Sequence, residues 1–237
     1  MDGMIPLGVT FDDTVVTKLV IGLIAWFAQM GFHEGGHAWA AWKLGDDTAY
    51  LMGKRTVNPF AHVNWREPFS VISAVVMPAV TSLYFGIPLG MAWVPVNPSK
   101  FRHPLRDNAI VAFAGPAGGF VVAIIFFLLY VAVYPIVSGP ELSTAGALLY
   151  RLIVITYITA IVYSVFNLVP IPPLDGSSIL YYFGNEPLRN LLDKIRPYGF
   201  MIIVVVFWIL GGGRIISPAI DALITPFVKI PPLIWGS

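Results

Sequence analysis

The residues with the clearest chemical potential are two histidines and a glutamate in the segment His33-Glu34-Gly35-Gly36-His37. The segment fits the His-Glu-x-x-His pattern, in which two histidines one helical turn apart point to one face and can both bind zinc. A carboxylate in the place of Glu34 can take a proton from zinc-bound water, whose pKa the metal lowers to about 7, and deliver it to a leaving amine. The pattern therefore predicts zinc-dependent hydrolysis, with His33 and His37 as metal ligands and Glu34 as the catalytic residue.

The surroundings of this pattern separate it from a chance match. It lies inside an apolar segment, Leu19–Leu44, where ionisable side chains are rare, costly and usually face a polar cavity or a partner. At a helical rise of about 1.5 Å per residue, His33 lies on the order of 15 Å from the end of this segment. The alternative is a hydrogen-bonded structural cluster or a proton relay. Gly35 and Gly36 argue against it, because they weaken a helix by roughly 1 kcal/mol each yet let another backbone approach closely.

A catalytic zinc usually has three protein ligands and a water, so a third ligand must lie outside the pattern. The candidates in the sequence are His62, Glu67, His103, Asp107, Glu141 and Asp175. Glu141 falls on the opposite side of the membrane in the topology given below, and His103 and Asp107 lie in a charged loop where solvation explains them. His62 stays an open alternative, although a histidine in a loop is more often a polar surface residue.

Asp175 is the predicted third ligand. It follows the uncharged stretch Leu168–Leu174, which continues an apolar span that ends on the same side as the histidine pair. Pro172 and Pro173 break the helix before it and Gly176 permits a tight turn after it, which would aim the carboxylate at a fixed point. A solvated aspartate at a helix end is the alternative. We expect one zinc ion per chain, with a bound water, held by this carboxylate and the two histidines.

Two further features lie in apolar segments. Asn167 stands two turns before Asp175, and an amide in such a stretch must satisfy its hydrogen bonds. It either bonds to a neighbouring helix or binds the substrate backbone or the oxyanion, and we assign it tentatively to substrate binding. The stretch Ala114-Gly-Pro-Ala-Gly-Gly119 is mainly a close-packing signal, which would let its helix sit against the two glycines of the zinc-binding pattern.

Composition places the chain in a membrane. Of 237 residues, 57% are hydrophobic and 11% are charged, and several apolar runs reach the length of about 20 residues that crosses a bilayer as helix. The chain has 14 basic and 13 acidic residues, so nothing in its charge favours nucleic-acid binding. It has no cysteine, which excludes disulfides, thiolate zinc sites and cysteine nucleophiles. We expect one membrane-embedded metalloprotease domain over residues 1–237, with no room for a sizeable soluble domain.

These segments predict an all-α polytopic membrane protein, a transmembrane helix bundle of about four to six segments. Prolines and glycines interrupt the apolar segment Phe69–Trp93, which we interpret as a re-entrant hairpin broken at Pro78 to Pro88. Tyr50–Arg66 is expected to be a loop that can include short β strands, and Gly184–Arg196 a charged loop. The expected spans are Leu19–Leu44, Ala109–Tyr134, Leu148–Val169 and a short Phe200–Leu210, followed by a tail from Arg214 that is either amphipathic or a last crossing.

The distribution of Lys and Arg gives an orientation. Basic residues populate the loops after Leu44, before Ala109 and after Val169, whereas Pro135–Thr144 has none. Short cytoplasmic loops are enriched in Lys and Arg, so the first three loops are expected in the cytoplasm. Phe69–Trp93 then has cytoplasmic loops on both sides, as a hairpin requires. We expect an integral membrane protein with its active site nearer the cytoplasmic side; the prokaryotic cell (inner) membrane is the location implied by the family resemblance given below.

At these residues the sequence resembles the site-2 protease family of intramembrane zinc metalloproteases, peptidase family M50, and in particular its compact prokaryotic branch without PDZ or CBS domains. The similarity extends over most of the chain. It is carried by His33-Glu-Gly-Gly-His37-Ala-Trp, Leu44-Gly-Asp, Asn58-Pro-Phe-Ala-His62, Pro95-Val-Asn-Pro98, Arg106-Asp107, Ala114-Gly-Pro116 and Asn167-Leu-Val-Pro-Ile-Pro-Pro-Leu-Asp-Gly176.

The resemblance implies zinc held by His33, His37 and Asp175, Glu34 as general base and acid, and Asn167 near the scissile carbonyl. It also implies cleavage of membrane-protein substrates within or beside their transmembrane helices, in regulated intramembrane proteolysis. Two positions depart from the family pattern: Gly119 stands where the family often has asparagine, and Asn64 where an aspartate is common. Neither belongs to the proposed metal ligands, so the departures concern substrate clamping.

Two other classes of protein compete with this interpretation. A zinc transporter can also place a His-Glu-x-x-His pair in a membrane helix, but transporters often show internal repeats and paired interrupted helices. The chain has no second copy of the His-Glu cluster, and Pro172-Pro-Leu-Asp-Gly176 has no counterpart elsewhere. A catalytically silent membrane scaffold is the other rival. The presence of a plausible base and three ligands argues against it.

Overall fold

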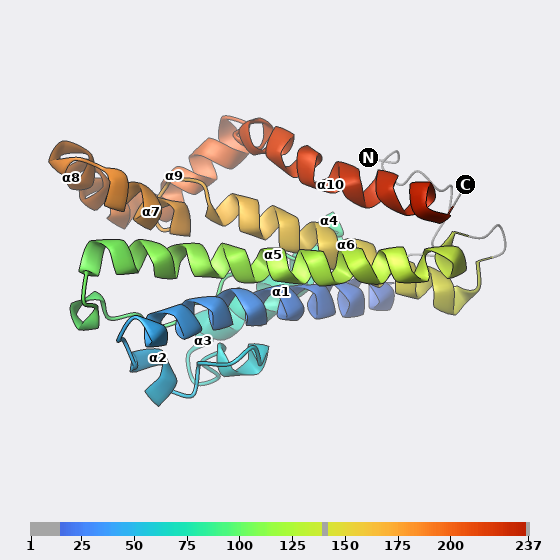
Figure 1. Cartoon of the computed structure of the whole chain (residues 1–237), viewed down its shortest axis with the longest axis horizontal. Coiled ribbons are helices and arrows are strands. Elements are labelled where there is room, and N and C mark those ends of the chain that lie inside the picture. The colour runs from blue at the N-terminus through green and yellow to red at the C-terminus, as the bar shows by residue number, and fades with distance from the viewer. Residues whose placement is uncertain (1–14, 139–141, 236–237) are drawn as a thin grey trace.

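The computed structural model describes residues 15–138 and 142–235, and every regular element within these ranges is a helix (Figure 1). The helices long and apolar enough to cross a membrane are α1 (Val15–Lys43), the continuous helix Pro68–Phe85, α5 (Pro104–Val137), α6 (Thr144–Asn167) and α10 (Gly213–Trp235). The prediction of an all-α polytopic membrane protein is confirmed, and these 5 candidate spans fall within the expected range.

Shorter helices connect the spans or gather at one end of the bundle. They are α2 (Thr48–Leu51), α7 (Asp175–Phe183), α8 (Glu186–Ile195) and α9 (Gly199–Val204), with 3-10 turns at Pro59–Ala61, Pro98–Lys100 and Arg196–Tyr198. Figure 1 shows α7 and α8 at the end of the bundle where α5 begins. That end also carries the C-terminus of α1, because Lys100 pairs with Asp47 at 2.6 Å just before α5.

The central layer consists of α1, α5 and α6, and small residues let its helices come close. A Cβ on Gly36 of α1 would overlap the carbonyl of Ala114 on α5. Likewise, a Cβ on Gly118 of α5 would overlap the carbonyl of Phe32. The structure thus confirms that the glycine-rich stretch of α5 packs closely against Gly36 of α1, whereas Gly35 faces the loop at Thr56 instead. The two helix axes can approach only because these positions lack side chains.

Helix α10 closes the bundle through aromatic contacts. The ring of Phe227 stacks on Tyr130 of α5 and Tyr157 of α6, with centroid distances of 4.4 and 4.2 Å. The Tyr157 hydroxyl also donates a hydrogen bond to the carbonyl of Leu223 at 2.6 Å. Such buried aromatic pairs contribute about 0.5–1.5 kcal/mol beyond the area they bury. They hold α10 along α5 and α6, as Figure 1 shows.

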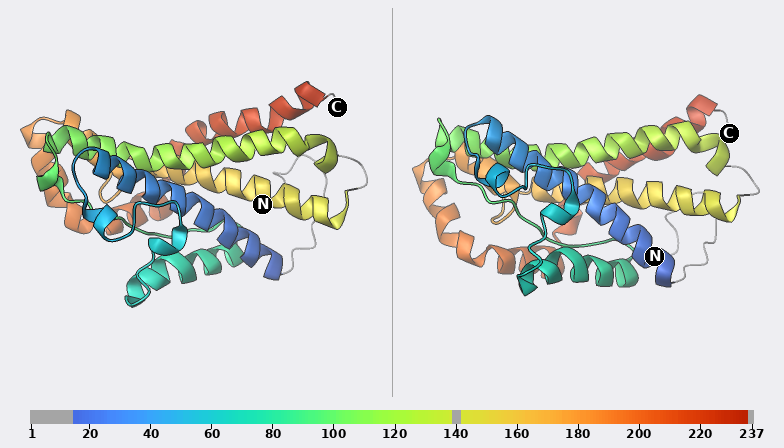
Figure 2. Two further views of the ribbon diagram at one scale, coloured as in Figure 1. Left: turned by 60° about the horizontal axis from the view of Figure 1, so that its bottom comes forward. Right: turned by 90° about the horizontal axis from the view of Figure 1, so that it is seen from below.

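The segment expected to be a hairpin does double back. Its first arm comprises α3 (Pro68–Val71), a π-helical turn (Ile72–Val76) and α4 (Met77–Phe85), and it ends at Gly86, whose φ is 72°. The chain then returns without helix from Pro88 to Asn97 (Figure 2). The Met91 N–H donates to the carbonyl of Ser73 at 3.0 Å, which ties the second arm to the first. The reversal lies at Gly86, within the region predicted from the prolines.

The hairpin is fastened to α1 at two depths. Deep in the bundle, the indole N–H of Trp26 donates to the carbonyl of Ala74 at 2.7 Å. At the end of α1, the N–H of Asn97 donates to the carboxylate of Asp46 at 2.6 Å. These two hydrogen bonds tie the helical arm and the end of the hairpin to α1 and to the residue that follows it.

Two expectations for the connecting segments were wrong. No strand forms in Tyr50–Arg66 in the part of the chain that the structure describes; α2 and the 3-10 turn Pro59–Ala61 occupy it instead. The backbone of this loop packs on α1 rather than beside another strand, so no ladder can form. Gly184–Arg196 is not a loop, because Glu186–Ile195 forms helix α8. The Asn185 side chain caps it, and buried Leu192 anchors it.

The C-terminal segments also differ from their expected division. Phe200–Leu210 does not form a separate span; it belongs to α9 and a π-helical turn (Val205–Ile209), after which Gly211 turns the chain at φ 69°. The following helix α10 has the length and apolarity of a crossing. Of the two alternatives for the tail, its length, composition and packing against α5 and α6 favour the crossing.

Candidate metal centre

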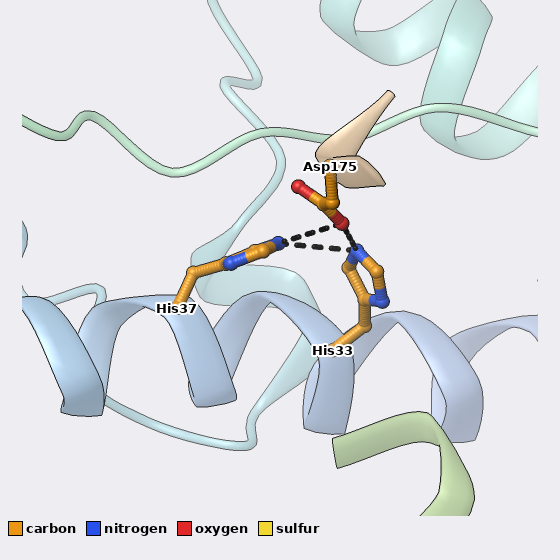
Figure 3. A group of neighbouring side chains, drawn as sticks. All are labelled: His33, His37 and Asp175. Atoms are coloured by element: carbon orange, nitrogen blue, oxygen red, sulfur yellow. Dashed lines mark hydrogen bonds and ion pairs between the residues drawn. The ribbon is translucent and has the colours of Figure 1, made fainter. Parts of the chain in front are cut away.

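His33, His37 and Asp175 point toward one another, as Figure 3 shows, and both histidines are buried. The histidines project from one face of α1, one turn apart, and the aspartate is the first residue of α7. The Nε2 atoms of the two histidines lie 3.2 Å apart. The Asp175 Oδ2 atom lies 3.2 Å from Nε2 of His33 and 3.4 Å from Nε2 of His37.

These distances suit a tetrahedral zinc ion. Ligand atoms about 2.0–2.1 Å from a tetrahedral zinc are separated from each other by about 3.3 Å. The three separations in the structure lie on either side of this value. Two imidazoles and a carboxylate are also donors that zinc prefers, and three protein ligands leave a fourth position open. The residues present therefore fit a catalytic zinc ion.

The hydrogen bond of His37 prepares its ring for a metal. Its Nδ1 atom lies 2.7 Å from the carbonyl of Val111 on α5. A carbonyl can only accept, so Nδ1 carries the proton and Nε2 keeps its lone pair for a metal. A bond of this kind also fixes the plane of a ligating ring. Helix α5 thereby orients a ligand of α1.

Gly115 of α5 is essential to this arrangement and was not identified from the sequence. A Cβ at this position would overlap the imidazole of His37. The sequence did contain a signal, since Gly115 lies in the glycine-rich stretch of α5. That stretch indicated helix packing in general, whereas one of its glycines makes space for a metal-binding side chain.

The loop between α6 and α7 brings Asp175 to the histidines. Helix α6 ends at Asn167, and the chain passes through Leu168–Leu174 without regular structure. The Leu174 N–H donates to the carbonyl of Ile171 at 2.9 Å, and Asp175 then begins α7. Gly176 is needed less for a tight turn than for close approach, because a Cβ there would overlap the carbonyl of Leu168.

The environment of Asp175 keeps it in the form that binds metals. Burial by itself raises the pKa of this carboxyl, but the neighbouring imidazoles of His37 and His33 outweigh burial and hold the pKa below its usual range. These neighbours favour the ionised form of Asp175, which is the form that a zinc ligand needs.

Glu34 is buried next to the two histidines in α1. Its charge also acts on His62, in the loop that follows α2. His62 is 2% exposed and donates a hydrogen bond from Nε2 to the carbonyl of Thr56 at 2.9 Å. Burial lowers the pKa of His62, and the bond to Thr56 and the charge of Glu34 offset this only in part. His62, which the sequence left open as a ligand, is therefore a neutral, buried residue near Glu34. It lies outside the metal-binding group.

The remaining candidates lie apart from the three ligands. The side chain of Asn167 is half-buried and donates to the carbonyl of Tyr163, in its own helix, at 3.0 Å. Asp107 is not solvated as expected; it is buried at the start of α5, where it accepts from the backbone N–H of His103 at 2.9 Å and pairs with Arg106 at 2.8 Å. Glu67 precedes α3, and Glu141 lies outside the described residues.

Membrane-spanning helices around two histidines, a buried glutamate and an aspartate define the class of membrane-embedded metallopeptidases. The chain belongs to peptidase family M50, the family of site-2 proteases, whose model matches residues 21–211. It is therefore an integral membrane protein and a zinc metalloendopeptidase of the site-2 type, as the sequence predicted.

Several relatives carry the same activity in their names. The chain is 32% identical over 213 residues to "Putative zinc metalloprotease YwhC" of Bacillus subtilis, covering 88% of each chain. It is 27% identical over 206 residues to "Putative zinc metalloprotease Rip2" of Mycolicibacterium smegmatis, covering 87% of this chain and 70% of that protein. For "Putative zinc metalloprotease MJ0611" of Methanocaldococcus jannaschii, the identity is 25% over 199 residues, with coverage of 84% and 87%. No solved structure matches the chain significantly.

Proposed function

We propose that this protein hydrolyses peptide bonds in or near the transmembrane helices of membrane-protein substrates, as in regulated intramembrane proteolysis. The observation that carries the proposal is the position of the metal-binding group. His33 lies in a membrane-spanning helix about ten residues, or on the order of 15 Å, from the end of α1 at Lys43. A peptide bond that reaches this centre must come from within or beside the bilayer core.

In this proposal His33, His37 and Asp175 hold one zinc ion per chain, and water or substrate occupies the fourth position. Zinc, when bound, supplies Lewis-acid polarisation of the scissile carbonyl and of the attacking water. Glu34 takes a proton from that water as the new C–O bond forms. It then delivers the proton to the amine nitrogen as the C–N bond breaks. Burial of Glu34 beside the ligands supports this role.

Asn167 is proposed to bind the substrate backbone. Its side chain is half-buried in the last turn of α6, eight residues before Asp175. One amide N–H bonds to Tyr163, so the second N–H and the carboxamide oxygen are left for a substrate. An unwound peptide presents both donors and acceptors, which such a group can satisfy.

The orientation of the protein is also a proposal. Basic residues cluster at the end of the bundle where α1 ends and α5 begins; they are Lys43, Lys54, Arg55, Lys100 and Arg102. The rule that cytoplasmic loops are positively charged then places this end in the cytoplasm. We propose that the protein resides in a prokaryotic cell membrane as one metalloprotease domain over residues 1–237, with water reaching the centre from the cytoplasmic side.

A reconstitution experiment separates proteolysis from zinc transport, the main alternative. Purified protein in liposomes receives a single-span substrate, and cleavage is measured before chelation, after chelation and after zinc is restored. Zinc flux is followed in the same vesicles with an enclosed indicator. We expect cleavage that stops on chelation and returns with zinc, without flux. Zinc flux without cleavage would contradict the proposal.

A further inference from the structure

The interior of the bundle contains buried polar groups on α1 and α6 that the proposed reaction does not use. Gln29 of α1 is 1% exposed, and Ser164 and Thr159 of α6 are 0% exposed. Both polar atoms of the Gln29 carboxamide and the hydroxyls of Ser164 and Thr159 make no hydrogen bond to the part of the chain that the structure describes. Buried polar groups are almost always satisfied, and bulk water does not reach the core of a bilayer. These groups therefore require an explanation.

A metal ligand in the same region has an unsatisfied atom as well. The Nδ1 atom of His33 is buried and has no hydrogen-bond partner among the described residues. Figure 3 shows that this atom points away from His37 and toward the N-terminal side of α1. His37 uses its own Nδ1 to bond to Val111. The two metal-binding rings thus differ in that one has a partner in the protein and the other does not.

Gln29 lies where it can supply that partner. It stands one turn before His33, and residues four apart on a helix are neighbours on one face. On α5, a Cβ on Gly118 would meet the backbone of Phe32 and His33, and a Cβ on Gly119 would meet the Gln29 carboxamide and the Ser164 hydroxyl. Because Gly118 and Gly119 are adjacent, the Gln29 carboxamide and the backbone at His33 face neighbouring positions of α5.

We propose that Gln29 is a positioning residue for His33. His33 Nδ1–H donates a hydrogen bond to one bridging water, which in turn donates a hydrogen bond to the Gln29 carboxamide oxygen and is also bonded to the Ser164 hydroxyl. A buried water typically makes about three hydrogen bonds, and these three groups provide them. The arrangement leaves Nε2 of His33 unprotonated for the metal, as Val111 does for His37. This inference rests on the proposed role of His33 as a zinc ligand.

The test compares two substitutions of nearly the same size. Gln29→Met removes the acceptor but keeps the volume, whereas Gln29→Glu keeps an acceptor oxygen. Thr159→Val serves as the control, because it removes another unpartnered buried hydroxyl, on α6 and more than one turn from Ser164. Zinc affinity is measured on the purified full chain by competition with a chelator. The absorption spectrum of the cobalt-substituted protein reports the geometry of the ligands without reference to proteolysis.

Loss of an outer hydrogen-bond partner typically weakens metal binding by about 10- to 100-fold, so we expect this loss and a shifted cobalt spectrum in Gln29→Met. Gln29→Glu and Thr159→Val are expected to keep the affinity and spectrum of the wild type. The inference is overturned by wild-type affinity in Gln29→Met, or by equal losses in Gln29→Met and Gln29→Glu, which would indicate packing alone. Failure of the wild-type protein to bind zinc would instead refute the proposed function, and the inference with it.

Discussion

At the scale of single residues, the candidate metal centre depends on groups from three helices, which are side chains of α1 and α7 and a backbone carbonyl of α5. Helix α1 supplies two imidazoles, α7 supplies a carboxylate, and α5 supplies Val111 to orient one ring. The separations of 3.2 to 3.4 Å between ligand atoms arise only when all three helices are in place. Replacement of one ligand should therefore affect metal binding before it affects the fold.

Asp175→Ala is expected to lower both zinc occupancy and proteolysis, because it removes one of three protein ligands. Metal analysis of the purified variant, expressed as zinc per chain, measures the first effect directly. His62→Gln is a suitable control, since His62 is buried near the centre but lies outside the metal-binding group. Full zinc occupancy in Asp175→Ala, together with loss of zinc in His62→Gln, would show that the ligand had been misassigned.

His62 should also make its loop sensitive to acid. Burial lowers its pKa from the ordinary value of 6.5, so the unfolded chain binds a proton more readily than the folded one. Stability is then retained above pH 6.5 and falls as the pH drops below it, toward the lowered pKa of the folded state. The protection factors of the backbone amides of residues 54–62, which are exchange rates corrected for their intrinsic pH dependence, should therefore fall between pH 7 and pH 5.5. The same pH dependence in His62→Gln would show that another group is responsible.

The proposed ligands could be identified from the sequence, whereas the residues that hold them in place could not. His33, Glu34 and His37 follow a helical spacing, and Asp175 stands out as a charge in an uncharged stretch. Val111 acts through its backbone carbonyl. Every residue has such a carbonyl, so the residue type gives no signal for this role. Gly115 acts by lacking a side chain, and its contact with His37 depends on how two helices cross.

At the scale of helices, close packing of α1 against α5 determines whether the ligands can meet. Gly36 and Gly118 bring the two backbones together, and Gly115 leaves space for the ring of His37. The stretch could be interpreted as a packing signal from its composition. Which of its glycines faces which residue of α1 depends on how the two helices cross, and the composition of the stretch does not give that crossing.

Gly115→Ala is expected to displace the His37 imidazole and weaken zinc binding. Overpacking of this kind typically costs about 1–3 kcal/mol, and here the ring is the group that must move. Zinc affinity by chelator competition measures the effect. Gly213→Ala is the matched control, because a Cβ at Gly213 meets no other atom. Equal zinc affinity in both variants would contradict the role assigned to Gly115.

The connecting segments show where local patterns fail. Tyr50–Arg66 contains residues that favour strands, but its backbone lies on the glycine face of α1, where no strand partner exists. Glu186–Ile195 is rich in charge, which suggested a loop. Its capping Asn185 and its buried Leu192 were the stronger signals for an amphipathic helix.

At the scale of the whole molecule, the hairpin from Pro68 to Asn97 places its two ends on one side, and the clustered basic residues support the proposal that this side is the cytoplasm. Met52 precedes the hairpin, Ser99 follows it, and Tyr84 lies near its tip with 80% exposure. The chain has no cysteine, so a single cysteine at each position can be labelled without interference. We expect Met52→Cys and Ser99→Cys to react with a membrane-impermeant reagent only from the cytoplasmic side. Labelling of these two positions from opposite sides would refute the hairpin topology.

The position of the centre also constrains the substrate. A transmembrane helix keeps its carbonyls in internal hydrogen bonds, so it must unwind locally before hydrolysis. Substrates with Gly or Pro near the cytoplasmic third of their span should therefore be cut faster than Leu-rich versions, at matched binding. Equal rates for both kinds of substrate would show that unwinding does not limit the reaction.

Asn167→Ala should slow cleavage without loss of zinc, because the proposed partner of the Asn167 side chain is the freed substrate backbone.

In the proposed function, this buried centre is a zinc hydrolase in which Glu34 moves protons without binding the metal. Glu34→Gln tests it most directly, because the amide has the same shape as the carboxylate but cannot act as a base. Zinc content and cleavage of a reconstituted membrane substrate are measured on the same preparation. We predict wild-type zinc content with cleavage reduced by about 10²- to 10⁴-fold, the usual contribution of a general base. Near-normal cleavage in a zinc-loaded Glu34→Gln protein would contradict the account.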